Sequence, residues 1–275
     1  MSNSCYSGAE GRQSLYELSY AASANELIVF VHGFMGFKDW GAWHLVQAAF
    51  VAAGFDFCRF NLSHNGTTPT NPLEFTALEA FSQNTYSKEV ADVHLLIAHL
   101  ENTHRSWDRI HLIGHSRGGG SALLASKFWP YQSALGEVIT WAGICDIGRR
   151  FPTGAALQEW EKTGVRTVLN GRTNQELPQS ILLYTDYQKH AADLAILEAA
   201  RQIGKRLHIF HGDKDLSVPL SEAYELAKAS GTKVGVIAGA DHVFGAVHPW
   251  EKPTLPPLLL ELVEKSVRCL NDSKP

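Results

Sequence analysis

The sequence has no excess of charge of either sign and no long hydrophobic run. Its 24 lysines and arginines nearly balance 28 aspartates and glutamates, which gives a formal net charge of −4. A nucleic-acid-binding protein of this size usually carries a basic excess or a basic stripe, and neither is present. The longest aliphatic runs, residues 27–31 and 258–260, fall far short of the roughly 20 residues that span a bilayer. We therefore expect neither a nucleic-acid partner nor a membrane partner.

Export signals and cysteine motifs are also missing. Residues 1–14 are small and polar and contain no apolar stretch of the kind that forms a signal-peptide core. The four cysteines, Cys5, Cys58, Cys145 and Cys269, are widely spaced and form no C-x-x-C pair. In the absence of export, scattered cysteines are expected to stay reduced. We therefore expect a cytoplasmic protein.

The hydrophobic content, 45% of 275 residues, is sufficient for one sizeable core, and we expect a single domain over residues 1–275. Short runs rich in Ile, Val and Phe alternate with helix-like segments. The predicted strands are 26–31, 55–60, 109–113, 137–142, 206–211 and 233–238, and the predicted helices are 43–53, 86–100, 121–129, 221–230 and 258–270. This alternation predicts the α/β class, with a doubly wound, mostly parallel sheet.

One interval breaks the alternation. About 60 residues, 143–205, separate two consecutive strands, where a crossover helix needs far fewer. The interval contains helical patterns at 155–162 and 191–203 and a polar stretch at 170–178. We expect a small helical cap, or lid, inserted over the carboxyl edge of the sheet. The alternative is one extra crossover with a long surface loop.

The most informative motif is a G-x-S-x-G sequence at Gly114, Ser116 and Gly118, between a predicted strand and a predicted helix. A serine at such a turn adopts a strained conformation that projects its hydroxyl from the sheet. Side chains two residues to either side would collide, so glycines are needed there. A phosphate-binding loop is excluded because no lysine follows Gly119 or Gly120. The pattern predicts a nucleophilic serine.

A nucleophilic serine needs an imidazole to accept its proton and a carboxylate to orient that imidazole. Asp213 and Asp215 follow the predicted strand 206–211, and His242 follows the strand 233–238. The chain order of serine, acid and histidine is the order found in doubly wound hydrolases. The residues alone leave two aspartates as candidates for the acid.

From His32-Gly33-Phe34-Met35-Gly36 through Gly-His-Ser-Arg-Gly-Gly to the final histidine, nearly the whole chain resembles the α/β-hydrolase-fold serine hydrolases. The similarity is greatest to the acyl-esterase and prolyl-oligopeptidase-like branches. It implies that Asp215, in the pattern H-G-x-x-D-x-x-V-P, is the acid of a catalytic triad with Ser116 and His242. Asp213 then has a role in the turn, and His248 is a wall or capping residue.

The resemblance also implies an oxyanion hole and a substrate pocket. One hole donor is the backbone N–H of Arg117, directly after the nucleophile, and the resemblance assigns the other to Phe34. Phe34 and Met35 would wall the acyl pocket. Trp141, at the end of a strand, and Trp160, in the predicted cap, are further candidates for pocket lining.

Thirteen histidines invite a metal hypothesis, but the sequence has no H-E-x-x-H and no C-x-x-C near a histidine pair. We expect no metal and no cofactor. Residues 61–66 follow a strand and end in Asn-Gly, which favours a surface turn over a role in the pocket.

The sequence therefore predicts a serine hydrolase that cleaves a small-molecule carboxylic ester through an acyl-enzyme. The Ser-Arg-Gly-Gly version of the motif keeps a second activity open, that of a peptidase or amidase of the prolyl-oligopeptidase-like type. A catalytically silent α/β-hydrolase-fold binding module is the third possibility. The sequence does not specify the oligomeric state.

Overall fold

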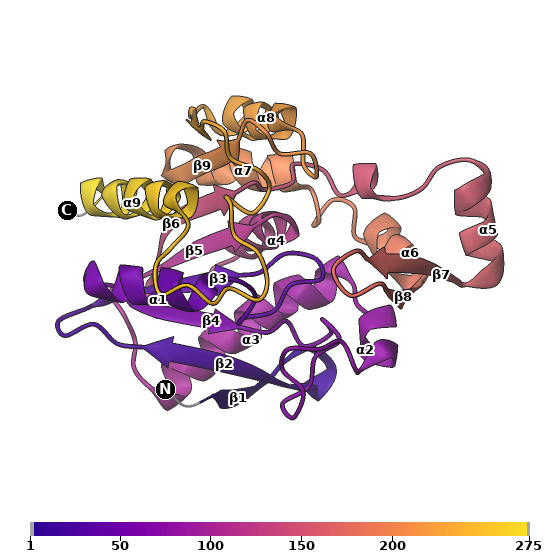
Figure 1. Ribbon diagram of the computed structural model, residues 1–275, viewed down its shortest axis with the longest axis horizontal. Coiled ribbons are helices and arrows are strands. Elements are labelled where there is room, and N and C mark those ends of the chain that lie inside the picture. The colour runs from indigo at the N-terminus through magenta and orange to yellow at the C-terminus, as the bar shows by residue number, and fades with distance from the viewer. Residues whose placement is uncertain (1–2, 274–275) are drawn as a thin grey trace.

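The computed structural model describes residues 3–273, and within them eight strands form one twisted sheet in the order β1-β2-β4-β3-β5-β6-β9-β10 (Figure 1). The strands are β1 (Ser4–Ser7), β2 (Gln13–Ser19), β3 (Glu26–Val31), β4 (Asp56–Phe60), β5 (Arg109–His115), β6 (Ala134–Trp141), β9 (Leu207–Gly212) and β10 (Val234–Ile237). The six from β4 to β10 are parallel, and each overlaps a strand expected from the sequence. The carboxyl ends of parallel strands lie on one edge, which is where loops can assemble a site.

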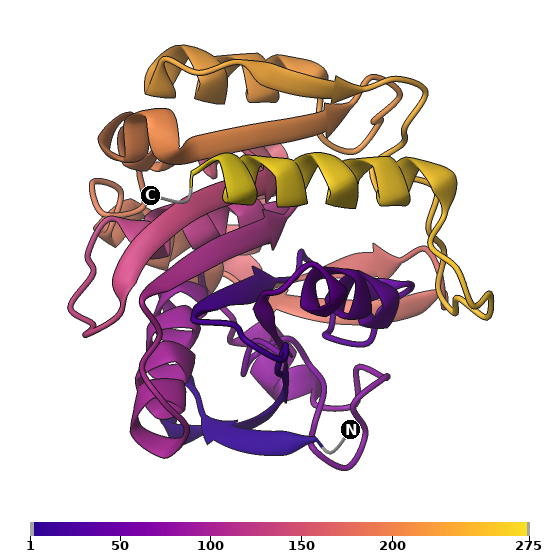
Figure 2. The ribbon, with the colours of Figure 1, turned by 90° about the vertical axis from the view of Figure 1, so that its left-hand side faces the viewer.

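Helices cover both faces of this sheet (Figure 2). They are α1 (Trp43–Ala52), α2 (Leu78–Ser82), α3 (Tyr86–Thr103), α4 (Arg117–Ser126), α5 (Ala155–Thr163), α6 (Leu182–Lys189), α7 (Ile196–Ile203), α8 (Leu220–Ser230) and α9 (Pro257–Asp272). One face packs against α1 and α9, and the other against α3, α4, α7 and α8. The doubly wound α/β fold is therefore confirmed. None of the helices described here combines the length and apolarity needed to cross a membrane.

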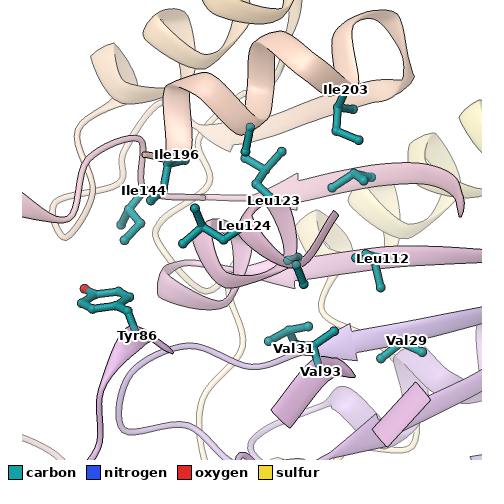
Figure 3. Close-up of a cluster of buried hydrophobic side chains, with 14 of the residues drawn as sticks. Val29, Val31, Tyr86, Val93, Leu112, Leu123, Leu124, Ile144, Ile196 and Ile203 are labelled. Atoms are coloured by element: carbon teal, nitrogen blue, oxygen red, sulfur yellow. The ribbon is translucent and has the colours of Figure 1, made fainter. Parts of the chain in front are cut away.

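The central strand β3 shows why the sequence adopts this arrangement. Every residue of β3 is buried. Ile28 and Phe30 face the layer of α1 and α9, whereas Val29 and Val31 face the opposite layer. Because side chains alternate between faces, a strand buried on both sides must be apolar throughout. Figure 3 shows Val29, Val31 and Leu112 of β5 beneath Leu123 and Leu124 of α4.

The N-terminal strands β1 and β2 were not expected from the sequence. They pair antiparallel with each other, and β2 pairs antiparallel with β4. β1 is a short edge strand with exposed residues. β2 lies between β1 and β4 and is mostly buried, but it carries the polar residues Ser14 and Glu17 at buried positions. Such a weak hydrophobic pattern does not distinguish a strand from a loop.

The long interval 143–205 contains more than the expected helices. Between α5 and α6 it forms a two-stranded antiparallel sheet of β7 (Val165–Asn170) and β8 (Gln175–Ser180). The polar stretch 170–178 includes the turn of this hairpin. The last helix, α7, packs against α4 and α8 in the layer that flanks the sheet. The part that projects from the body is thus α5, the hairpin and α6, at one end of the molecule (Figure 1).

Trp141 lies in the core and lines no cavity at the carboxyl edge, which corrects the expectation from the sequence. It is fully buried on the face of α1 and α9. Its ring centroid lies 5.7 Å from that of Phe30, and its Nε1 donates a hydrogen bond to Ser266 Oγ at 3.0 Å. The side-chain alternation along β6 directs this indole to the face opposite α4.

We predict that Trp141→Phe lowers the free energy of unfolding by about 1–3 kcal/mol, through lost packing and one lost hydrogen bond. Urea denaturation measures this change. Labelling of Ser116 by a fluorophosphonate should keep the wild-type rate, because the indole is buried between the sheet and the layer of α1 and α9. Slower labelling in a variant of unchanged stability would contradict this placement.

Candidate active site

Ser116 occupies a sharp turn between β5 and α4, with φ 58° and ψ −123°. Its N–H donates to the carbonyl of Trp141 at 2.8 Å. The flanking glycines are required by close backbone contacts. A Cβ on Gly114 would lie 2.2 Å from the carbonyl oxygen of Gly118, and one on Gly118 would lie 2.3 Å from the carbonyl oxygen of Val31. The steric argument made from the sequence is confirmed by these contacts.

The structure brings Ser116, His242 and Asp215 together from three loops. Ser116 Oγ lies 2.9 Å from His242 Nε2, and His242 Nδ1 lies 2.7 Å from Asp215 Oδ2. Asp215 follows β9 and His242 follows β10, both at the carboxyl edge of the sheet. These are hydrogen-bond distances in the order needed to pass a proton from the serine to the imidazole.

The other two candidates lie elsewhere. Asp213 Oδ1 accepts a hydrogen bond from the N–H of Gly239 at 2.6 Å, in an exposed turn. His248 Nδ1 accepts one from the N–H of Gly41 at 2.8 Å, and its ring stacks on Trp40. Neither contacts Ser116 among the interactions of the described chain. Asp213 therefore has the turn position that the resemblance implied, and His248 holds the main chain of Gly41.

The carboxylate of Asp215 is buried and held in its charged form. Burial alone would raise its pKa, but hydrogen bonds from His211, His242 and the N–H of Val218 hold the pKa well below its usual range. Its Oδ1 also accepts from the N–H of Ser217 at 2.8 Å. Backbone and imidazole donors together stabilise the anion.

Two buried histidines, His211 and His115, lie next to this group. His211 Nε2 lies 2.9 Å from the carbonyl of Val218 and 3.2 Å from Asp215 Oδ2. His115 Nε2 donates to the carbonyl of His242 at 2.8 Å, and burial lowers the pKa of His115 to about 3. A neutral His115 thus fixes the main chain of His242 without adding charge.

The loop after β3 places a second backbone donor near the serine. The N–H groups of Phe34 and Arg117 have no hydrogen-bond acceptor in residues 3–273. His32 holds this loop, because its Nδ1 donates to the carbonyl of Gly33 at 2.9 Å and its Nε2 accepts from the N–H of Leu62 at 3.1 Å. Burial lowers the pKa of His32 to about 4, so the ring is neutral.

Residues 61–66 are buried, which corrects the expected surface turn. Asn61 Oδ1 accepts a hydrogen bond from the N–H of Lys38 at 2.6 Å, and the N–H of Ser63 donates to Asp92 at 2.7 Å. The segment packs against the loop that contains His32 and Phe34 and supports it. The Asn-Gly pair predicts a turn, but it does not predict whether other parts of the chain bury that turn.

Two cavities meet at Ser116 and share Phe34 and His242. The smaller, of about 200 Å³, is lined by Met35 and by Asn170 of β7. The larger, of about 390 Å³, lies beneath the hairpin, with Val168 and Gln179 in its wall. The arrangement can accommodate the two halves of a substrate on either side of the serine.

Trp160 lies behind the larger cavity and does not line it, contrary to the expectation from the sequence. It is fully buried, and its Nε1 donates to the carbonyl of Gln179 at 3.0 Å. The guanidinium of Arg166 covers its ring at 4.1 Å. Trp160 therefore supports Gln179 and Arg166, which are two of the residues that line the larger cavity. Within the described residues, no cluster of three His, Cys, Asp or Glu side chains could hold a metal ion.

We predict that Gly118→Ala disrupts the turn, because the added Cβ would meet the carbonyls of Val31 and His32 at 2.3 and 2.4 Å. Neither main-chain atom can move without shifting β3, and the expected loss of stability is about 3 kcal/mol or more. Gly171→Ala is the matched control, since nothing lies within 4 Å of its Cβ position. Thermal unfolding should separate the two variants, and equal melting temperatures would contradict the steric argument.

Comparison with known proteins agrees with the fold and the motifs. The family model described as "Alpha/beta hydrolase family" matches residues 28–253. Esterase PIR7B of Oryza sativa subsp. japonica is 24% identical over 259 residues, which cover 82% of this chain and 92% of that protein. Among solved structures, a putative hydrolase from Agrobacterium vitis S4 has a TM-score of 0.73 at 13% identity, with 98% of each chain covered. Est1E from Butyrivibrio proteoclasticus, solved with ferulic acid bound, has a TM-score of 0.73 at 18% identity, with 98% of this chain and 100% of that chain covered. The chain described here belongs to the alpha/beta hydrolase family.

Proposed function

We propose that the protein hydrolyses a carboxylic ester through an acyl-enzyme, with Ser116, His242 and Asp215 as the catalytic triad. The observation that carries this proposal is the chain of two hydrogen bonds, 2.9 Å from Ser116 to His242 and 2.7 Å from His242 to Asp215. Family membership and a relative that is named an esterase support it.

In the first step, Ser116 Oγ attacks the ester carbonyl carbon while His242 Nε2 accepts the hydroxyl proton. Asp215 accepts the Nδ1–H of His242 and so fixes the tautomer that has a free lone pair on Nε2. The carbonyl oxygen becomes an oxyanion near the unpaired N–H groups of Phe34 and Arg117. Each such donor typically contributes about 3–4 kcal/mol of transition-state stabilisation.

Collapse of this intermediate expels the alcohol, which takes the proton from His242 and leaves Ser116 acylated. Water then attacks the acyl carbon, gives its proton to His242 and regenerates the serine as the carboxylic acid leaves. These steps need only the triad, the two N–H groups and water, so the reaction requires no cofactor.

The part of segment 143–205 that runs from α5 to α6 acts as a cap in this proposal. The hairpin of β7 and β8 supplies residues to both cavities and separates the serine from bulk solvent on that side. Phe34 lies between the cavities and Met35 lines the smaller one, so both are proposed to contact the substrate.

Replacing Ser116 by Ala should lower kcat for a p-nitrophenyl ester by about 10⁴-fold or more, because the nucleophile is lost. Circular dichroism should show an unchanged fold. Ser126→Ala is the matched control, since Ser126 lies on the same helix and its Oγ donates only to the carbonyl of Leu123. A fluorophosphonate should label the wild type and Ser126→Ala but not Ser116→Ala. Retained turnover in Ser116→Ala, or a folded wild type that resists labelling, would reject the proposal.

The acid limb of the pH profile of kcat/KM should have a slope of one, that is, a tenfold drop in rate per pH unit, because the proposed mechanism uses one general base. Burial keeps the pKa of His115 at about 3 and that of His32 at about 4, and Asp215 stays ionised, so none of the three adds a second slope above about pH 5. Rates measured over the pH range in which thermal unfolding shows a folded protein test this, and a limb of slope two would contradict it.

A further inference from the structure

Three arginines line the larger cavity beside Ser116. Arg117 begins α4, Arg150 precedes Phe151, and Arg166 lies on β7 of the hairpin. No aspartate or glutamate is among the residues of the described chain that line this cavity. A site that gathers one sign of charge next to a nucleophile selects for ligands of the opposite sign.

Two of these arginines are already neutralised by buried glutamates. Arg117 Nη2 lies 2.8 Å from Glu89, and Arg150 pairs with Glu222. In both pairs the glutamate is buried behind the cavity wall. The pairs hold the guanidinium groups in place but leave no excess charge.

Arg166 supplies the excess positive charge. It has no carboxylate within 4.0 Å in the described chain, and it donates from Nε and Nη2 to Gln179 Oε1, the Nε bond being 2.7 Å long. Its remaining nitrogen, Nη1, has no protein acceptor there. The side chain of Arg166 is half-buried, so it loses hydration without gaining a counter-ion. Burial therefore lowers the pKa of Arg166.

Unpaired donors surround the same space. The Nε atoms of Arg117 and Arg150 are buried without a hydrogen-bond partner. Tyr86 is 2% exposed, its hydroxyl has no partner in the described residues, and its ring lies 3.8 Å from the Arg117 guanidinium. In Figure 3 Tyr86 lies beside Ile144, at the margin of the apolar cluster. Burial raises the pKa of Tyr86, whereas the positive charges of the three arginines lower it. The phenol is therefore close enough to all three guanidinium groups to interact with their charge.

We propose that the larger cavity binds a carboxylate carried by the ester substrate, with Arg166 as its counter-ion. This inference rests on the ester hydrolysis proposed above and narrows it to esters that bear an anionic group. The planar guanidinium, oriented by Gln179 and Trp160, matches the geometry of a carboxylate. A single excess charge balances a carboxylate, whereas a phosphate dianion would leave one negative charge without a partner in this cavity.

The cavity wall also has an apolar part, which indicates the character of the rest of the substrate. Ile144, Phe151, Val168 and Leu183 line the same cavity as the arginines and Ser116. A hydrocarbon segment between the ester and the carboxylate would contact these side chains. Monoesters of aliphatic dicarboxylic acids combine an ester, a hydrocarbon segment and a carboxylate in this way. Esters of carboxylated aromatic alcohols do so too.

The test compares matched esters that differ only in the carboxylate. Mono-p-nitrophenyl esters of the acids from succinic to suberic are paired with p-nitrophenyl esters of the monocarboxylic acids of equal length, and 4-carboxyphenyl hexanoate is paired with phenyl hexanoate. We expect the wild type to have the higher kcat/KM for the charged member of at least one pair. In Arg166→Gln that value should fall by about 10–100-fold, since a charge-assisted hydrogen bond is lost. The neutral member should change less than about threefold.

Two further variants separate recognition from structure. Arg166→Lys keeps the charge but not the planar fork, and should recover part of the preference. Arg201→Gln removes the same charge from the exposed surface of α7, where within residues 3–273 Arg201 pairs only with Glu198. It should leave the turnover of both esters unaffected. An equal fall for charged and neutral esters in Arg166→Gln would mean that Arg166 only braces the hairpin, and would overturn the proposal. So would a wild type with no preference for the charged member of any pair.

Calorimetric binding of monomethyl adipate to Ser116→Ala, with and without Arg166→Gln, separates this proposal from the proposed chemistry. Arg166-dependent binding together with a wild type that turns over no ester would reject ester hydrolysis and support the anion site. Ester turnover in the wild type with binding that does not depend on Arg166 would reject the anion site alone.

Discussion

The site depends on the close crossing of helix α4 over strands β3 and β5. Gly118 is in contact with the carbonyls of Val31 and His32, and Gly114 with the main chain of α4. These contacts leave the chain no conformation at Ser116 except the strained one with positive φ. The same crossing points the N–H of Arg117 outward at the start of the helix, so the position of the nucleophile and that of one proposed oxyanion donor have a common origin.

The electrostatics of the site are arranged around one permanent anion. Asp215 keeps its charge because imidazole and backbone N–H groups replace the water that burial removes. Around it, burial holds His32 and His115 neutral, so they act as hydrogen-bonding supports and add no competing charge. Of the histidines close to Ser116, only His242 contacts both the serine and the aspartate. In the proposed mechanism a single imidazole therefore carries the proton transfer, while its neighbours fix its position.

The loops at the carboxyl edge of the sheet supply the proposed catalytic residues, and the segment from α5 to α6 supplies part of the cavity walls. β7 contributes to both cavities and β8 to the larger one. Phe34, Ser116 and His242 are common to both spaces, whereas Arg166 belongs to one and Asn170 to the other. In the proposed function, reaction type and substrate choice are thus carried by different parts of the chain, and the proposed selection of a carboxylate does not involve the proposed triad.

The sequence by itself determined the parallel sheet, because strands buried on both faces must be continuously apolar, as Glu26–Val31 is in all but its first residue. It also determined the position of Ser116, because only glycines fit two residues to either side of that turn. The strands β1 and β2 and the hairpin were not predicted, because β1 and the hairpin are partly exposed and β2 has polar residues at buried positions, so the hydrophobic pattern of all of them is weak. Only the tertiary structure decided that Asp215 and not Asp213 meets His242, that Trp141 and Trp160 lie behind the walls, and that Arg166 has no carboxylate partner. Each of these outcomes depends on contacts between segments far apart in the chain, which local pattern and spacing do not encode.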